Sequence, residues 1–267
     1  MKPETKRTFK VAIQLCLVCS VVVSALAVGL KPIQEEQKEA FRQQSILSAA
    51  GLWEDGADAG QLYEEHIGVI GLDLEDDKPE DDDLKSPKFD LAKALQNPEW
   101  HHELPPSEDV AGLKEVENYS VIYQVPKEGR PQKIILPIRG KGLWSTLYGF
   151  ITLDVSRIQD GPEHVKVAGL TYYKHGETPG LGGEVDNDLW KAKWPDKLVF
   201  DEHWDVKVKV AKNAAGDYQV DALSGATLTS NGVSNMLKFW LGDDGFGPYL
   251  QRLAQNSTAA VNRPATF

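Results

Sequence analysis

Four short apolar segments decide the fold class of this chain: YSVIYQV (119–125), KIILPIR (133–139), YGFITLDV (148–155) and VKVAGLTYY (165–173). Each is rich in β-branched and aromatic residues, and glycine and proline lie between them, which is typical of β-strands. Residues 205–210, DVKVKV, alternate charged and apolar residues and predict a further strand with one solvated face. We therefore expect a sheet in the second half of the chain.

Helical patterns flank these strands. The pattern predicts a helix over residues 31–52, another over residues 184–194, and a third that begins near Thr229 or Ser230 and continues to residue 241. Either hydroxyl residue is a suitable N-cap. Strands that follow one another along the chain, with helices before and after them, predict an α+β fold with an antiparallel sheet.

An uncharged apolar segment occupies residues 11–30 near the N-terminus. A helix rises about 1.5 Å per residue, so this segment covers about 30 Å, the thickness of a bilayer core. Lys2, Lys6, Arg7 and Lys10 precede it, which predicts a cytoplasmic N-terminus and export of all that follows. A signal peptide cleaved after Ala27 is the alternative, and a mature N-terminus at Val28 would establish it. Because the segment contains no ionisable acid, base or histidine, we interpret it as an anchor and not as an ion pathway.

Composition excludes several classes of protein. The formal net charge is −11, with no basic stripe after the first ten residues, so a nucleic-acid-binding function is not expected. Cys16 and Cys19 are the only cysteines, and both lie in the apolar segment, where we interpret them as apolar packing residues. The glycines of TPGLGG (178–183) do not have the spacing of a nucleotide-binding loop. No metal site is expected.

An acidic, proline-containing stretch covers residues 71–90. We interpret it as a solvated loop, because it lacks the order of acids and glycine that an EF-hand calcium loop requires. The predicted organisation is a cytoplasmic N-terminus (1–10), a transmembrane helix (11–30), a membrane-proximal helix with the acidic insert (31–118), the sheet domain (119–255) and a flexible tail (256–267).

Residues 221–230, DALSGATLTS, concentrate small and hydroxyl side chains just before the third predicted helix. The N-terminus of a helix favours a phosphate, because its first N–H groups are free and its dipole is positive there. Gly225 and Ala226 leave room for a bulky group. Asp221, Ser224, Gly225, Ala226 and Thr227 resemble the flavinylation motif Asp-x-x-Ser/Thr-Gly-Ala-Thr, in which the last threonine is joined through its hydroxyl to the phosphate of FMN.

Two more segments resemble the FMN-binding domains of membrane redox complexes. In HGETPGLGGEV (175–185) the glycines, including Gly182, allow backbone to approach a flat ring, Leu181 offers an apolar face, and Glu177 and Thr178 offer polar contacts. In GKGLWSTLYGF (140–150), Trp144 is either a partner of the isoalloxazine ring or an ordinary core aromatic residue.

With the N-terminal anchor, these segments resemble the C subunits of the sodium-translocating NADH:quinone oxidoreductases. The G subunits of Rnf-type complexes are the close alternative, but they are typically shorter between residues 52 and 118. The resemblance implies a covalent FMN on Thr227, attached by a flavin transferase. It implies electron transfer from NADH on another subunit to a neighbouring FMN-bearing subunit and then to ubiquinone, coupled to sodium export. It also implies a bacterial inner-membrane protein with a periplasmic domain. An assembly module without a redox role is the alternative from a different class, and a secreted flavoprotein is a third.

Overall fold

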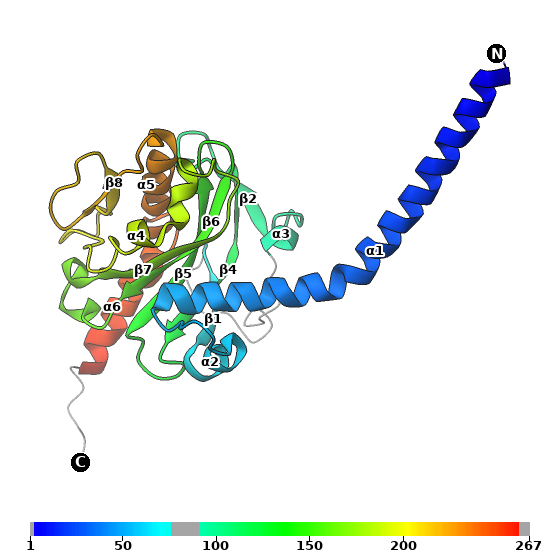
Figure 1. Ribbon diagram of the computed structural model, residues 1–267. Coiled ribbons are helices and arrows are strands. Elements are labelled where there is room, and N and C mark those ends of the chain that lie inside the picture. Colours follow the sequence, from blue (N-terminus) through cyan, green and yellow to red (C-terminus); the bar gives the residue numbers. More distant parts are fainter. Residues whose placement is uncertain (1–2, 76–90, 262–267) are drawn as a thin grey trace. The chain divides into compact units, whose positions relative to one another are not determined.

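The computed structural model describes residues 3–75 and 91–261 (Figure 1). The chain divides into two units, Met1–Arg42 and Gln43–Phe267, which are described separately. The helices are α1 (Pro3–Ala50), α2 (Ala59–His66), α3 (Leu91–Ala94), η1 (Ile158–Asp160), η2 (Pro162–His164), η3 (Gly182–Asp186), α4 (Asp188–Lys191), α5 (Thr227–Leu241) and α6 (Gly247–Val261), where η denotes a 3₁₀-helix. The strands are β1 (Gly68–Asp73), β2 (His101–Glu103), β3 (Glu115–Glu117), β4 (Tyr119–Val125), β5 (Lys133–Lys141), β6 (Thr146–Asp154), β7 (Lys166–Lys174), β8 (Lys209–Ala211) and β9 (Gln219–Asp221).

The first unit contains most of α1, which is long and apolar enough to cross a membrane. Its apolar side chains from Phe9 to Ile33 are about half exposed or more within the structure. Exposed leucine and valine on every side of a helix are unfavourable in water and favourable in lipid. The same helix continues to Ala50, so the apolar segment and the helix predicted over residues 31–52 form one element.

The second unit is built on a five-stranded sheet with the order β1-β4-β5-β6-β7, in which every neighbouring pair is antiparallel. The four strands predicted between residues 119 and 173 are confirmed as β4 to β7. Strand β1 was not predicted; it pairs with β4 along its whole length, from Gly68 opposite Gln124 to Asp73 opposite Tyr119. The sheet is thus antiparallel, as expected, but its edge strand comes from a segment far earlier in the chain.

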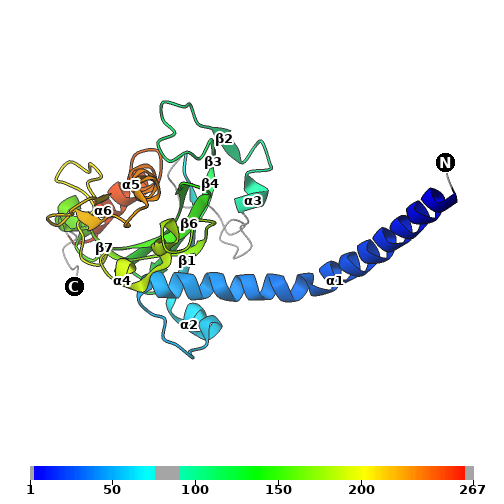
Figure 2. The ribbon, with the colours of Figure 1, turned by 45° about the horizontal axis from the view of Figure 1, so that its top comes forward.

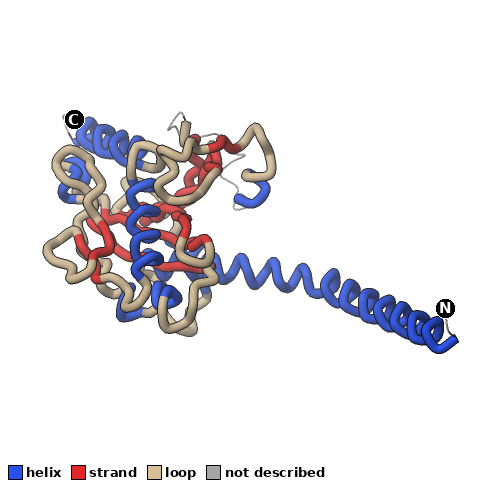
Figure 3. The backbone as a smooth tube through the Cα atoms, turned by 90° about the horizontal axis from the view of Figure 1, so that it is seen from above, coloured by secondary structure: helices blue, strands red, loops and turns tan. Residues whose placement is uncertain are grey.

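Both faces of the sheet are buried, because alternate residues of each strand point to opposite faces. On one face, Ile122, Ile134 and Ile151 join the large core that also contains the buried side of α5. On the other, Tyr123, Ile135 and Phe150 pack with the end of α1 and with Tyr63 of α2. Figure 2 shows α5 and α6 on one side of the sheet and α2 on the other, and Figure 3 shows the strands, in red, from above.

Helix α5 approaches strand β5 very closely. A Cβ atom on Gly232 would lie 2.2 Å from the carbonyl oxygen of Lys141 at the end of β5, so only glycine fits there. Trp240, two turns further along, donates from Nε1 to the carbonyl oxygen of Arg139 at 2.7 Å. These contacts hold α5 against β5 along the length of the helix.

Several sequence predictions need correction. The helix predicted over residues 184–194 is instead the 3₁₀-helix η3 followed by the short helix α4, because Asn187 is extended and caps α4 with its own side chain. Of residues 205–210 only the last two belong to a strand, β8, which pairs in parallel with β9. There the Asp201 side chain accepts from the amides of His203 and Asp205, which competes with strand pairing.

The third correction concerns the start of α5, which is Thr227 and not Thr229 or Ser230. The acidic stretch lies mostly outside the described residues, which omit 76–90. Its first three residues, 71–73, form the end of β1 and are not part of a loop.

A buried ion pair joins β3 to β5: Arg139 donates to Glu117, and both side chains are almost fully buried. Arg139 also donates to the carbonyl oxygen of Glu115 and lies over the ring of Trp240. Removing one partner of a buried pair leaves the other charge uncompensated, which costs far more than loss of an exposed pair.

We therefore expect Glu117→Ala to lower the free energy of unfolding by about 3–5 kcal/mol. Arg157→Ala, which breaks the exposed pair with Asp160, is the matched control and should cost less than about 1 kcal/mol. Denaturant unfolding of the full chain in detergent, followed by tryptophan fluorescence, measures both. Equal costs for the two variants would contradict the importance of the buried pair.

Candidate functional site

The motif predicted for flavin attachment forms a turn and the first residues of α5. Ser224 and Gly225 make the turn, with Gly225 in the left-handed region at φ = +70°. Ala226 is the N-cap, and no side chain caps the helix. The first turn of α5 also contains no acidic residue. The N–H groups at this end of the helix are therefore available to an anion.

The structure separates the four hydroxyl residues of this stretch into two pairs. Ser224 and Thr227 are exposed, whereas Thr229 and Ser230 are buried. Both buried hydroxyls have partners: Thr229 Oγ1 donates to Glu177 at 2.7 Å, and Ser230 Oγ accepts from the amide of Leu223 at 3.0 Å. Of the two exposed residues, only Thr227 lies in the helix, as its first residue.

Glu177 is the centre of a buried polar cluster, which also contains Leu143, Trp144, Ser145 and Thr229; we call it the Glu177 cluster. Its Oε1 accepts from the amides of Trp144 and Ser145, both at 3.0 Å, and from Ser145 Oγ at 3.1 Å. Its Oε2 accepts from the amide of Leu143 at 3.2 Å and from Thr229 Oγ1. Three successive amides thus point at one carboxylate, which is the geometry of an anion-binding turn.

The charge of Glu177 follows from this arrangement. Burial alone would raise the pKa of its carboxyl group, but the hydrogen bonds from Thr229, Ser145, Trp144 and Leu143 outweigh burial and lower the pKa below its usual range. Glu177 is thus a carboxylate near neutral pH, although its side chain is only 5% exposed.

The segment after Glu177 folds tightly over the start of α5. The Thr178 carbonyl oxygen accepts from the amides of Leu181 and Gly183, which closes the loop. A Cβ atom on Gly182 would lie 2.6 Å from Thr229 Oγ1 and 2.7 Å from Glu177 Oε2, so the Glu177 cluster requires glycine here. Leu181 Cδ2 lies 3.0 Å from the position of a Cβ atom on Gly225, so its side chain covers the turn before Thr227.

Large apolar side chains around these segments are exposed. They include Trp144, which is 68% exposed, and Leu228, the neighbour of Thr227, which is 59% exposed. Leu143 and Leu181 are also exposed. The interpretation of Trp144 as an ordinary core aromatic residue is therefore wrong. Exposed apolar side chains on segments that meet at one place are unusual on a soluble domain and indicate a surface that a ligand or partner covers.

Asp221 lies at the end of β9, before the turn. Its carboxylate forms an ion pair with Lys193 at 3.2 Å and accepts from the amide of Ala214. The Lys193 ammonium is the main cause that lowers the pKa of Asp221. The carbonyl oxygen of Asp221 accepts from Trp190 Nε1 at 2.8 Å, so Asp221 joins α4 to the turn.

These residues fit an FMN group by the chemistry that they offer. An exposed hydroxyl at an uncapped helix N-terminus suits a phosphate, and exposed Trp144, Leu181 and Leu228 suit an apolar aromatic ring. Glu177 does not fit the polar contact expected of it, because both of its oxygens already accept hydrogen bonds within the protein.

Two residues of the Glu177 cluster were not predicted as such. Thr229 was expected as a possible helix cap, and Ser145, whose Oγ also accepts from the amide of Gly176 at 2.7 Å, was not predicted. A helix turns about 100° per residue, so two hydroxyls two positions apart must face opposite ways. That spacing was the available signal for Thr229, once the helix start is placed at Thr227. Ser145 had no comparable signal.

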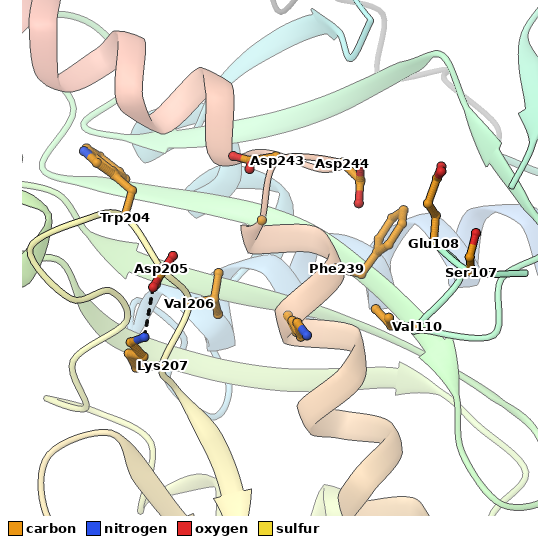
Figure 4. A pocket seen from close by; sticks show the side chains of 12 residues that line it. Ser107, Glu108, Val110, Trp204, Asp205, Val206, Lys207, Phe239, Asp243 and Asp244 are labelled. Atoms are coloured by element: carbon orange, nitrogen blue, oxygen red, sulfur yellow. Dashed lines mark hydrogen bonds and ion pairs between the residues drawn. The ribbon is translucent and has the colours of Figure 1, made fainter. Parts of the chain in front are cut away.

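A separate cleft of about 570 Å³ lies at the other end of α5 (Figure 4). Phe239, Asp243 and Asp244 line it from the C-terminal end of the helix, and Trp204 and Val206 line it from the segment before β8. No residue of the flavinylation motif contributes to it. The cleft therefore does not belong to the candidate flavin site.

The comparisons with known proteins agree with the geometry. Residues 142–242 match the family model of the FMN-binding domain, and this range contains every predicted site residue. The fold is similar to the crystal structure of Shewanella oneidensis NqrC, with a TM-score of 0.72 and 28% identity over 82% of this chain and 99% of that one. A second structure, of the corresponding Na(+)-translocating NADH-quinone reductase component from Parabacteroides distasonis, has 24% identity and a TM-score of 0.59 over 84% of this chain and 96% of that one, and it supports the fold.

Curated relatives cover nearly the whole chain. The NqrC protein of the Na(+)-translocating NADH-quinone reductase from Pseudomonas aeruginosa is 44% identical over 94% of this chain and 96% of its own length. Its Yersinia pestis counterpart is 41% identical over 94% of each chain. This chain therefore belongs to the NqrC family of the Na(+)-translocating NADH-quinone reductases, and not to the G subunits of Rnf-type complexes.

Proposed function

We propose that this chain carries an FMN joined through its phosphate to the hydroxyl of Thr227 and serves as an electron-carrying subunit of a sodium-translocating NADH:ubiquinone reductase. The observation that carries the proposal is the position of Thr227: it is the exposed hydroxyl at the uncapped N-terminus of α5, where the neighbouring hydroxyls of Thr229 and Ser230 are buried and already bonded. The names of the relatives supply the complex in which such a subunit works.

Each part of the site has a distinct task in this proposal. The free N–H groups at the start of α5 stabilise the negative charge that a phosphate keeps after attachment. Trp144, Leu181 and Leu228 provide apolar surface for the ring system. When bound, FMN would supply the electron-transfer chemistry, and the chain's own residues would bind and orient it. The protein holds that group in place and shields one side of it from water.

Thr227 acts only once, during maturation. A flavin transferase moves FMN from FAD to its hydroxyl: a phosphoester bond to the threonine oxygen replaces the diphosphate bond of FAD, and AMP leaves with the hydroxyl proton released. Asp221 and Ser224, both exposed, are available to that enzyme. Asp221 is also tied to Lys193 and to Trp190, so it positions the turn as well. Ser224 and Gly225 allow the turn to present Thr227 to solvent.

The apolar α1 places the domain at a membrane in this proposal. The cluster of Lys2, Lys6, Arg7 and Lys10 keeps the N-terminus in the cytoplasm of a bacterial cell and sends the flavin domain to the periplasm. There the domain receives and delivers electrons through neighbouring subunits of the complex, including one that bears another FMN. A membrane-tethered assembly module without a redox role is the competing function.

Substitution of Thr227 tests the attachment. The full chain, co-expressed with a flavin transferase, should give a fluorescent band on a denaturing gel under ultraviolet light, and Thr227→Ala should abolish it because the acceptor hydroxyl is gone. Thr229→Val is the matched control and should keep the band, since its hydroxyl is buried. A band that persisted in Thr227→Ala would move the attachment to another residue. A wild-type chain without a band would favour the assembly module.

Reporter fusions test the topology. Alkaline phosphatase fused after the last residue should be active in cells, because it folds only after export, and green fluorescent protein at the same place should remain dark. The matched variant replaces Lys2, Lys6, Arg7 and Lys10 by glutamine, which should reduce export by weakening the charge bias. Sequencing of the mature N-terminus completes the test. If the mature chain begins at Val28, the apolar segment is a cleaved signal peptide and not an anchor.

A further inference from the structure

Glu177 accepts five hydrogen bonds from groups on two other segments of the chain. A carboxylate offers about four lone-pair sites, so its capacity is filled. Glu177 is also only 5% exposed, so it offers a ligand almost no surface. Glu177 therefore acts on the site through the groups that it holds.

Those groups come from the two elements that carry the proposed flavin contacts. The amides of Leu143, Trp144 and Ser145 form the turn between β5 and β6, whose Trp144 side chain points outward. The hydroxyl of Thr229 belongs to the first turn of α5, two residues after Thr227. One carboxylate thus links the turn that presents Trp144 to the helix end that presents Thr227.

We infer that Glu177 is a positioning residue: its carboxylate fixes the Leu143–Ser145 turn to the start of α5 and so holds Trp144 and Thr227 in one fixed relation. All five partners are donors, and a carboxylate accepts without donating. Glutamine at this position would replace one carboxylate oxygen by an NH₂ group. That group would face an N–H donor of the turn, from Leu143 on one side or from Trp144 and Ser145 on the other, and two donors cannot bond to each other. The negative charge is therefore part of the function, because charge-assisted hydrogen bonds are stronger than neutral ones.

The first test does not depend on any flavin. Hydrogen–deuterium exchange of the full chain in detergent reports on the amides of Leu143, Trp144 and Ser145 directly. Glu177→Ala should speed their exchange by about tenfold or more, since loss of hydrogen bonds to a charged group exposes these amides to solvent. Glu177→Gln should give a smaller increase, because its remaining oxygen still accepts. Glu184→Gln is the matched control and should match wild type: it lies seven residues further along the chain, in η3, and its carboxylate accepts from Asn187 outside the cluster.

Peptides from β5 (Lys133–Lys141) show whether each variant is folded. If Glu177→Ala also speeds exchange in β5, that variant is not fully folded, and the Glu177→Gln and Thr229→Val variants then decide whether Glu177 positions the turn. Thr229→Val removes one bond to Glu177 and leaves the turn amides in place, so it should speed exchange of the Ser230 amide, which bonds to the Ala226 carbonyl oxygen in the first turn of α5, more than exchange of the turn amides. Unchanged exchange of residues 143–145 in a folded Glu177 variant would overturn the inference.

The second test rests on the proposed function and uses the chain loaded by the transferase. Glu177→Gln should still take up FMN on Thr227, but the circular dichroism of the flavin absorption band should weaken, because Trp144 no longer has a fixed position beside it. Wild type without any attached FMN would contradict the proposed function and leave the exchange result to decide the role of Glu177. A flavin signal identical to that of wild type in Glu177→Gln, together with unchanged exchange, would overturn the inference alone.

Discussion

The close approach of α5 to β5 is the constraint on which the site depends. Gly232 lies against the carbonyl oxygen of Lys141, where no Cβ atom fits, and Trp240 is bonded to the carbonyl oxygen of Arg139. The helix is therefore held against the strand at both places, and its first turn must lie beside the turn that follows β5. This proximity allows a single carboxylate to reach both. Without it, Glu177 could bond to the turn or to the helix but could not join the two.

The Glu177 cluster shows how one buried charge organises a surface site. Glu177 draws the amides of residues 143–145 inward, and the side chains of Leu143 and Trp144 are left to point outward. The same bond network draws Thr229 inward and leaves Thr227 and Leu228 outside. Burial of the turn amides and of the Thr229 hydroxyl thus leaves exposed the apolar side chains and the Thr227 hydroxyl that the proposed flavin needs.

Local patterns predicted most of the sheet and little of the site. Strands β4 to β7 are indicated by β-branched and aromatic residues between turn residues, whereas β1 offers only the short apolar run of residues 67–72, which leads directly into the acidic stretch. Helix α5 starts earlier than expected because its N-cap is Ala226, which has no capping side chain to recognise. Residues 205–208 alternate like a strand, but Asp201 binds the local backbone first. The contacts of Glu177 span 32 to 52 positions in the sequence, so no local pattern could reveal them.

Charge explains why a covalent bond suits this chain. The protein has a formal net charge of −11, so its overall field repels an anionic phosphate. The local attraction at the start of α5 is worth only about 0.3–1 kcal/mol at an exposed helix end. Even micromolar retention requires about 8 kcal/mol, and an exposed apolar surface must supply nearly all of it. The phosphoester bond that we propose to Thr227 would remove that requirement, and the helix end would then have only to stabilise the charge of a group that is already attached. The site therefore needs orientation more than affinity, which is the task that the buried carboxylate of Glu177 is placed to perform.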